Sequence, residues 1–171
     1  FFSRTGTGIA HCPCSNMRLA SGIAPLRTWI DKGVKVGLGV DGSSSNDSGY
    51  LLNEARQAML LQRVNLGANK FSPREALFTA TRGGAEVLNR NDIGQISVGK
   101  AADFAIYDLN KIAMSGAWSD PLAALVLCTP AETAYTICNG EIISQNGHLN
   151  NFDLNLSLEK HKVASKRLLD L

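Results

Sequence analysis

Two short polar segments of this sequence carry residue types that could do chemistry, and each follows an apolar run. The first, His11–Asn16, follows Ile9-Ala10, and the second, Asp41–Asp47, follows the alternating run Val34–Val40. A parallel α/β enzyme presents its active site on polar residues at the carboxyl ends of its strands. An Asp carboxylate there can bind a divalent metal and can carry a proton between a water and a leaving group. Asp41 is therefore a candidate metal ligand and catalytic residue, and the alternative is a surface strand that ends in an Asp-Gly turn.

Four further residues of these segments are candidates for contact with a substrate. His11 ends a predicted strand, where a functional role and a buried structural role are equally open. Asn16 could hydrogen-bond a polar ring, although Asn is also common in turns and at helix ends. Cys14 could line a pocket or serve as a buried structural thiol, and Ser43 lies in a polar, adaptable loop. Pro13 is expected to shape the first segment as a loop, because proline interrupts strand pairing.

A catalytic metal site needs about three protein ligands, and in this sequence only Asp41 is a plausible one. Cys12 and Cys14 are separated by a single residue, whereas zinc sites usually separate their cysteines by about two to four. A zinc ion would fit an aspartate ligand, and so would iron. The remaining ligands are therefore expected to lie outside this chain.

The strand that leads to Asp41 has two different faces. Its apolar positions are Val34, Val36, Leu38 and Val40, and the positions between them are Lys35, Gly37, Gly39 and Asp41. In a closed barrel the valine face would pack against the outer helices. The glycine face would then point inward and leave space beneath Asp41, where a carboxylate could reach a metal or substrate at the barrel axis.

Helices and strands alternate up to about residue 90, and the pattern then changes. Helices are predicted over 25–32, 50–64 and 73–88, the last one starting with the capping-box sequence Ser72-Pro73-Arg74-Glu75 and containing Gly83-Gly84, which allows close packing or marks a bend. Short strands follow at 103–107, 133–138 and 141–145, and Asn139-Gly140 predicts a hairpin. The expected organisation is an α/β barrel part over 1–90, a small all-β module over 91–154 and a terminal helix over 155–171.

Length and composition limit the classes of function. A complete (β/α)8 barrel takes about 250 residues, so a chain of 171 residues is expected to be the C-terminal part of a larger enzyme. A net charge of +2 gives no reason to expect nucleic acid as a partner, and no apolar run is long enough to cross a membrane. The four cysteines lack the spacing of a disulfide framework, which favours a cytoplasmic protein.

Several strings of this sequence resemble the amidohydrolase superfamily, in its cytosine/guanine deaminase and chlorohydrolase branch. His11-Cys12-Pro13 with Ser15-Asn16, and Gly39-Val40-Asp41-Gly42, resemble the motifs of barrel strands seven and eight. Ile93–Phe104 is similar to the region where those enzymes leave the TIM barrel and enter a β-sandwich. Cys14–Leu19 and Ser119–Val126 resemble most the 8-oxoguanine deaminases and the hydroxyatrazine ethylaminohydrolases of this branch.

The resemblance implies a reaction and a cofactor. Asp41 matches the aspartate that binds one divalent metal, zinc or else iron, and shuttles the proton; His11 and Asn16 match a motif that lines the pocket. The implied reaction is hydrolytic deamination of an amino-substituted, purine-like ring with release of ammonia. The histidine ligands and a glutamate would come from an N-terminal part of the barrel that this chain does not contain, and relatives of this kind are often homo-oligomers.

Two alternatives remain at this point. The first is an s-triazine aminohydrolase or chlorohydrolase, which would use the same metal and the same aspartate on a different heterocyclic ring. The second is an inactive structural fragment, which applies if the chain truly starts at Phe1. An open half-barrel exposes strand edges and apolar faces, so this second alternative predicts association or aggregation of the isolated chain.

Overall fold

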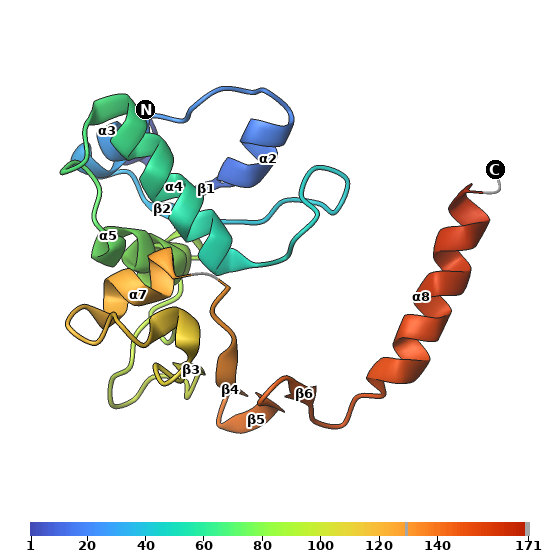
Figure 1. Ribbon diagram of the computed structural model, residues 1–171. Coiled ribbons are helices and arrows are strands. Elements are labelled where there is room, and N and C mark those ends of the chain that lie inside the picture. Colours follow the sequence, from blue (N-terminus) through green and yellow to red (C-terminus); the bar gives the residue numbers. More distant parts are fainter. Residues whose placement is uncertain (129, 170–171) are drawn as a thin grey trace. The chain divides into compact units, whose positions relative to one another are not determined.

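The computed structural model describes residues 1–128 and 130–169, which form two compact units (Figure 1). The first unit comprises 1–101 together with 109–131, and the second comprises 102–108 together with 132–171, of which residues 170 and 171 lie outside the described part. The first unit therefore includes a segment, 109–131, that lies in sequence between two strands of the second. No helix of the described residues is long and apolar enough to cross a membrane.

The first unit is built on two parallel strands, as the sequence predicts. Strand β1 (Ile9–His11) pairs with β2 (Val36–Leu38) in the register Ile9↔Val36 and His11↔Leu38. A short helix α1 (Phe2–Thr5) precedes β1, and the crossover between the strands contains α2 (Pro13–Arg18) and α3 (Leu26–Asp31). Parallel strands with helical crossovers confirm the expected α/β class.

A long helix and a second, interrupted helix follow β2. Helix α4 (Leu51–Leu66) is the longest of the first unit, and its buried residues include Leu52, Ala55, Ala58 and Met59. Helix α5 (Pro73–Phe78) starts with the predicted capping box, in which Ser72 Oγ accepts from the Glu75 amide and the Glu75 carboxylate accepts from the Ser72 amide. The helix continues as a π-helical turn, η1 (Thr79–Gly83), and ends as α6 (Gly84–Val87).

The glycine face of β2 is not open space, which corrects the expectation of room beneath Asp41. A Cβ added at Gly37 would lie 2.7 Å from the Gly84 Cα, and a Cβ added at Gly83 would overlap the carbonyl oxygen of Val36. The backbone of η1 and α6 therefore packs directly against β2. Glycine is required at these positions because no side chain fits between the two backbones.

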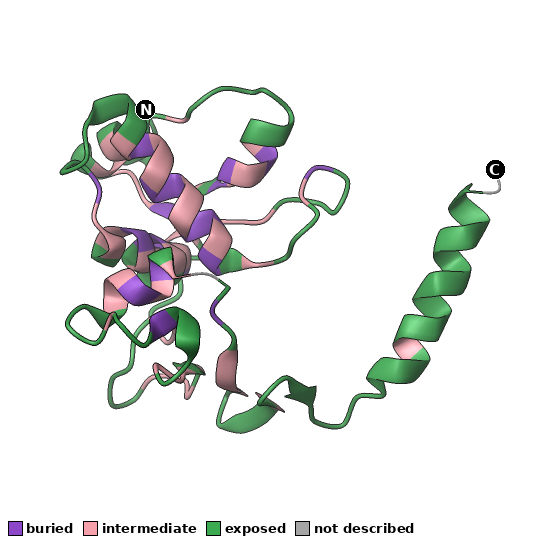
Figure 2. Cartoon of the chain, viewed as in Figure 1, coloured by how far each residue is buried: buried purple, intermediate pink, exposed green. Residues whose placement is uncertain are grey.

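The core of the first unit lies between α4 and the neighbouring elements, as the purple positions along α4 indicate (Figure 2). Val36 belongs to this core with Leu26 and Phe71, and Val34 and Leu38 pack against it, so the valine face of β2 does meet helices. Helix α7 (Pro121–Leu127), whose N-cap is Asp120, adds Val126 to the same core. A 3-10 turn, η2 (Ile112–Met114), precedes α7.

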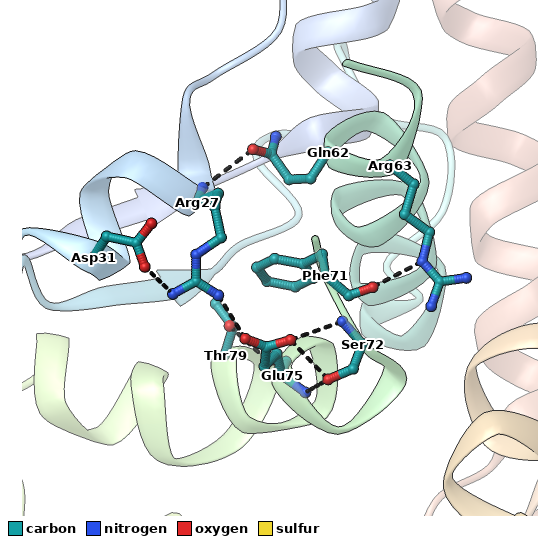
Figure 3. A network of polar contacts seen from close by, with 8 residues as sticks. All are labelled: Arg27, Asp31, Gln62, Arg63, Phe71, Ser72, Glu75 and Thr79. Carbon is teal, nitrogen blue, oxygen red and sulfur yellow. Dashed lines mark hydrogen bonds and ion pairs between the residues drawn. The ribbon is translucent and has the colours of Figure 1, made fainter. Parts of the chain in front are cut away.

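A set of polar contacts, here called the Arg27 network, joins α3, α4 and α5 (Figure 3). The Arg27 guanidinium forms ion pairs with Asp31 and Glu75, and its backbone N–H donates to Gln62 Oε1 at 3.1 Å. Gln62 is fully buried, and its Nε2 donates to the Ala24 carbonyl at 2.9 Å. Each polar group of Gln62 thus has a partner, which is the condition for burying an amide without a large cost.

The second unit contains one antiparallel sheet in the order β3-β4-β5-β6. Its strands are β3 (Phe104–Tyr107), β4 (Thr133–Cys138), β5 (Glu141–Gln145) and β6 (His148–Leu149). The predicted hairpin is present, and Asn139 and Gly140 both have positive φ, as a type I′ turn requires. A β-sandwich was expected; the described residues of this unit provide this single sheet, followed by α8 (Leu154–Leu169), none of whose described residues is buried.

Candidate active site

Asp41 lies three residues beyond the end of β2, in a backbone conformation with φ of 64°. Its carboxylate accepts three hydrogen bonds. Oδ2 accepts from Ser15 Oγ at 2.5 Å and from Ser45 Oγ at 2.9 Å, and Oδ1 accepts from the backbone N–H of Gly42 at 2.8 Å. The side chain is therefore held in one orientation, while the residue itself is exposed to solvent.

These donors also set the charge of Asp41. The hydroxyl of Ser15, then the Gly42 amide and the hydroxyl of Ser45, hold the pKa of the Asp41 carboxyl below its ordinary value. Hydrogen bonds to the charged form favour that form, so Asp41 is a carboxylate at neutral pH. Oδ1 accepts a single hydrogen bond from the described residues, which leaves it a second lone pair for a cation or a proton.

Ser15 reaches Asp41 because the first polar segment is helical. The expectation that Pro13 shapes a loop is wrong: α2 begins there, and Pro13 occupies the first helical position, where its missing N–H costs no hydrogen bond. The helix starts two residues after β1 and directs the hydroxyl of Ser15, a residue that is 2% exposed, at the carboxylate. Sequence reasoning did not select Ser15 or Ser45 as site residues.

A buried glutamate, Glu54 of α4, joins the two polar segments. Its Oε2 accepts from the backbone N–H of Cys14 at 3.0 Å, and its Oε1 accepts from Asn46 Nδ2 at 2.6 Å. Asn46 Nδ2 also donates to the carbonyl of Val40 at 2.8 Å. The sequence contained one signal for this role, since position 54 shares the helical face of Leu51 and Ala58, three and four residues away.

His11 and Cys14, both predicted to contact a substrate, lie close to Glu54. His11 is 3% exposed, its ring packs edge-on against Trp29, and its Nε2 has no hydrogen-bond partner among the described residues. Burial lowers the pKa of His11, and the Glu54 charge opposes this shift. Burial, followed by the hydrogen bond and charge of Glu54, raises the pKa of the Cys14 thiol to about 12. Cys14 is therefore a protonated thiol at neutral pH and no nucleophile.

The other two predicted residues are not joined to Asp41. Asn16 is half-buried in α2, and Ser43 is exposed in the turn after Asp41. In the part of the chain that the structure describes, neither side chain forms a hydrogen bond with the carboxylate, whose donors are Ser15, Gly42 and Ser45.

The Asp41 carboxylate is suited to be one ligand of a divalent metal. Asp41 offers an exposed carboxylate oxygen with a free lone pair, which suits zinc or another divalent cation. Residues 1–128 and 130–169 contain no group of three His, Cys, Asp or Glu side chains that could hold a metal ion. Asp41 could thus complete a metal site whose other ligands come from elsewhere.

A family model and individual known proteins both match this chain. The amidohydrolase family model matches residues 2–143. The chain is 44% identical to the 8-oxoguanine deaminase of Pseudomonas aeruginosa, over 96% of this chain and 36% of that protein. It is 38% identical to the hydroxydechloroatrazine ethylaminohydrolase of Pseudomonas sp. strain ADP, over 87% of this chain and 32% of that protein.

A solved structure agrees with these relatives. The zinc complex of the atrazine chlorohydrolase of Arthrobacter aurescens TC1 superposes with a TM-score of 0.87 at 34% identity, covering 95% of this chain and 36% of that one. The chain thus spans about a third of the length of the curated relatives it matches. At these identities the likeness concerns both fold and sequence.

Proposed function

This chain belongs to the amidohydrolase family, and from that premise we propose that it carries the metal-binding, proton-transferring aspartate of a hydrolytic deaminase. The substrate would be an amino-substituted, purine-like ring of the 8-oxoguanine type. The observation that carries the proposal is the geometry of Asp41: a charged, exposed carboxylate after β2, fixed by three donors. The barrel assignment belongs to the same proposal, with β1 and β2 as strands seven and eight of a TIM barrel.

The chemistry asked of Asp41 is transfer of one proton in two steps. A bound divalent metal, zinc in the first place, would act as a Lewis acid that lowers the pKa of a water to about 7. Asp41 would accept a proton of that water while the oxygen of the water bonds to the ring carbon. Asp41 would then give this proton to the departing amino group. The products are the oxo-substituted ring and ammonia. The serine and amide donors keep Asp41 deprotonated beforehand and keep its free oxygen pointing in one direction.

His11, Asn16, Cys14 and Ser43 are proposed to line the substrate site. Their support is position: His11 ends β1, Cys14 and Asn16 lie in α2 directly after it, and Ser43 follows β2 on the same segment as Asp41. A neutral His11 with a free Nε2 is suited to accept or donate a hydrogen bond to a polar ring. The protonated Cys14 thiol offers a weakly polar wall.

The second candidate substrate class is an s-triazine. Its specific support is the pair of triazine-acting relatives, one similar in sequence and the other in structure. Both classes are flat, nitrogen-rich rings with an exocyclic leaving group, so both would use Asp41 in the same way. We further propose a cytoplasmic homo-oligomer; the four free cysteines fit a reducing compartment.

The test uses the natural full-length protein. Its intact mass is measured first, because a mass well above 18.3 kDa supports an additional barrel part that supplies the other ligands. Metal content and ammonia release from 8-oxoguanine, other aminopurines and amino-s-triazines follow. We expect about one metal per chain and turnover with one ring class; Asp41→Asn should lower turnover by about 1,000-fold or more, the range of a lost acid–base group. Near-native turnover of Asp41→Asn with bound metal would overturn the proposal, as would a natural mass near 18.3 kDa without metal.

A further inference from the structure

Glu54 is the buried acidic side chain that contacts both segments bordering Asp41. Glu54 is fully buried on α4. It accepts a hydrogen bond from the backbone N–H of Cys14, which lies 40 residues away in the sequence. The ion pairs of the described residues do not include Glu54. Burying a carboxylate without a cation is costly, and an apolar residue would fill the same place in a core. Packing alone therefore does not explain a glutamate at this position.

Two hydrogen bonds of Glu54 reach the two segments that border Asp41. In the first segment, Oε2 holds the backbone N–H of Cys14, the residue directly before Ser15, whose hydroxyl donates to the Asp41 carboxylate. In the second segment, Oε1 holds the amide of Asn46, which also donates to the carbonyl of Val40, the residue directly before Asp41. One rigid carboxylate thus fixes both the backbone that carries Asp41 and the backbone that carries its strongest donor.

We propose that Glu54 is a positioning residue of the site: it sets the distance and orientation between Asp41 and Ser15 without contacting the substrate. The proposal rests on the proposed function of Asp41. Loss of this support would let the two segments separate, and Asp41 would then sample several orientations instead of one. Because acid–base and metal-ligand roles both need one orientation, turnover should fall while binding of the ring changes little.

Gln62 provides a matched control on the same helix. It is as fully buried as Glu54, and it also makes two hydrogen bonds, to the Arg27 amide and to the Ala24 carbonyl. The pair of variants Glu54→Gln and Gln62→Glu exchanges the same two groups at nearly constant volume. In each variant one of the two hydrogen bonds is replaced by a repulsion, donor against donor at position 54 and acceptor against acceptor at position 62. Both should lower Tm, but only the first disturbs Asp41.

The experiment measures kcat, KM, Tm and hydrogen exchange of the full-length protein and these two variants. We expect Glu54→Gln to lower kcat, per folded molecule, by about 10–100-fold with little change in KM, the usual effect of losing a group that orients a ligand. Exchange should accelerate over residues 12–18 or over residues 40–47, according to which donor, the Cys14 N–H or the Asn46 amide, faces the new NH2 group. Gln62→Glu should instead accelerate exchange over 24–27, because its carboxylate repels the Ala24 carbonyl, and should keep kcat. Asn46→Ser, which cuts one of the two connections in a surface loop, should lower kcat in the same direction and serves if Glu54→Gln does not fold.

The outcomes separate this inference from the proposed function. If Asp41→Asn abolishes turnover but Glu54→Gln and Asn46→Ser work as fast as Gln62→Glu, Glu54 is only structural and the inference is wrong. If the unaltered protein deaminates no ring, the proposed function fails, and the exchange measurement then decides whether Glu54 holds the two segments. Unchanged exchange over both 12–18 and 40–47 in Glu54→Gln overturns the inference in either case.

Discussion

Two polar networks lie along α4, and they differ in what they leave unpaired. Around Gln62, the Arg27 network buries a neutral amide and pairs its charged groups with one another, Arg27 with Asp31 and with Glu75. Around Glu54, neither acidic side chain of the candidate site forms an ion pair among the described residues, and Asp41 is exposed. The first arrangement holds helices together. The second leaves negative charge in a fixed place, which suits a site that must attract a cation.

The largest expected effect on stability comes from disturbing the packing of η1 against β2, the strand that leads to Asp41. Gly83→Ala places a Cβ on the carbonyl oxygen of Val36, so β2 and η1 must separate. We expect a loss of about 3 kcal/mol of unfolding free energy, at the upper end for overpacking, measured by chemical denaturation.

The neighbouring Gly84 supplies the control for that change. A Cβ at Gly84 meets nothing within 4 Å and its φ of −60° is helical, so Gly84→Ala should leave stability unchanged or raise it by about 0.5–1 kcal/mol. Equal changes in stability in the two variants would contradict this interpretation, because the close contact with Val36 is made at Gly83 and not at Gly84.

A smaller effect tests the structural role of the Arg27 network. Arg27→Met keeps the apolar part of the side chain but loses the ion pairs with Asp31 and Glu75. Because both carboxylates are more than a third exposed, solvent screens these pairs, and we expect a loss of about 1–2 kcal/mol with no change in kcat. The exposed pair Arg82–Glu86 provides the control, since Arg82→Met should cost less than about 0.5 kcal/mol. A fall of kcat in folded Arg27→Met would erase the distinction between the two networks.

The smallest effect is a dependence of stability on pH at His11. Burial lowers its pKa in the folded protein below the ordinary 6.5, so the unfolded chain binds the proton more tightly. The stability that a neutral His11 contributes is complete above about pH 6.5 and is lost as pH falls below it. We expect a loss of less than about 1 kcal/mol for the first pH unit below 6.5. His11→Gln should make the decline of Tm below that pH less steep. The same substitution at the exposed His148 should leave the slope of this decline unchanged. An unchanged slope in His11→Gln would contradict the burial of a neutral imidazole next to Glu54.

Local signals were sufficient for much of the fold. Ser72 and Glu75 specify a helix start within one turn, and Asn139-Gly140 specifies a hairpin, because the interactions concerned span only a few residues. Alternation along 34–40 identified β2 and its core-facing side. The strand end and its aspartate, Asp41, followed from the same pattern.

Long-range contacts account for what the sequence did not reveal. Glu54 shares a helical face with Leu51 and Ala58, but its acceptor role depends on Cys14, which is 40 residues away. Ser15 could be selected only after Pro13 was known to start a helix. The packing of 109–131 with the first unit has no local signal either, because Val126 is apolar in any arrangement that buries it.

The left-handed backbone of Asp41 restricts which acids evolution can try at this position. With φ at 64°, the residue occupies a region that Asp, Asn and Gly tolerate and other side chains adopt at a cost of about 1–2 kcal/mol. Glutamate, the only other acidic side chain, would need a rebuilt turn as well as room for an extra methylene. If Asp41 has the proposed role, a change of metal or of substrate ring is therefore easier at this site than a change of the acid.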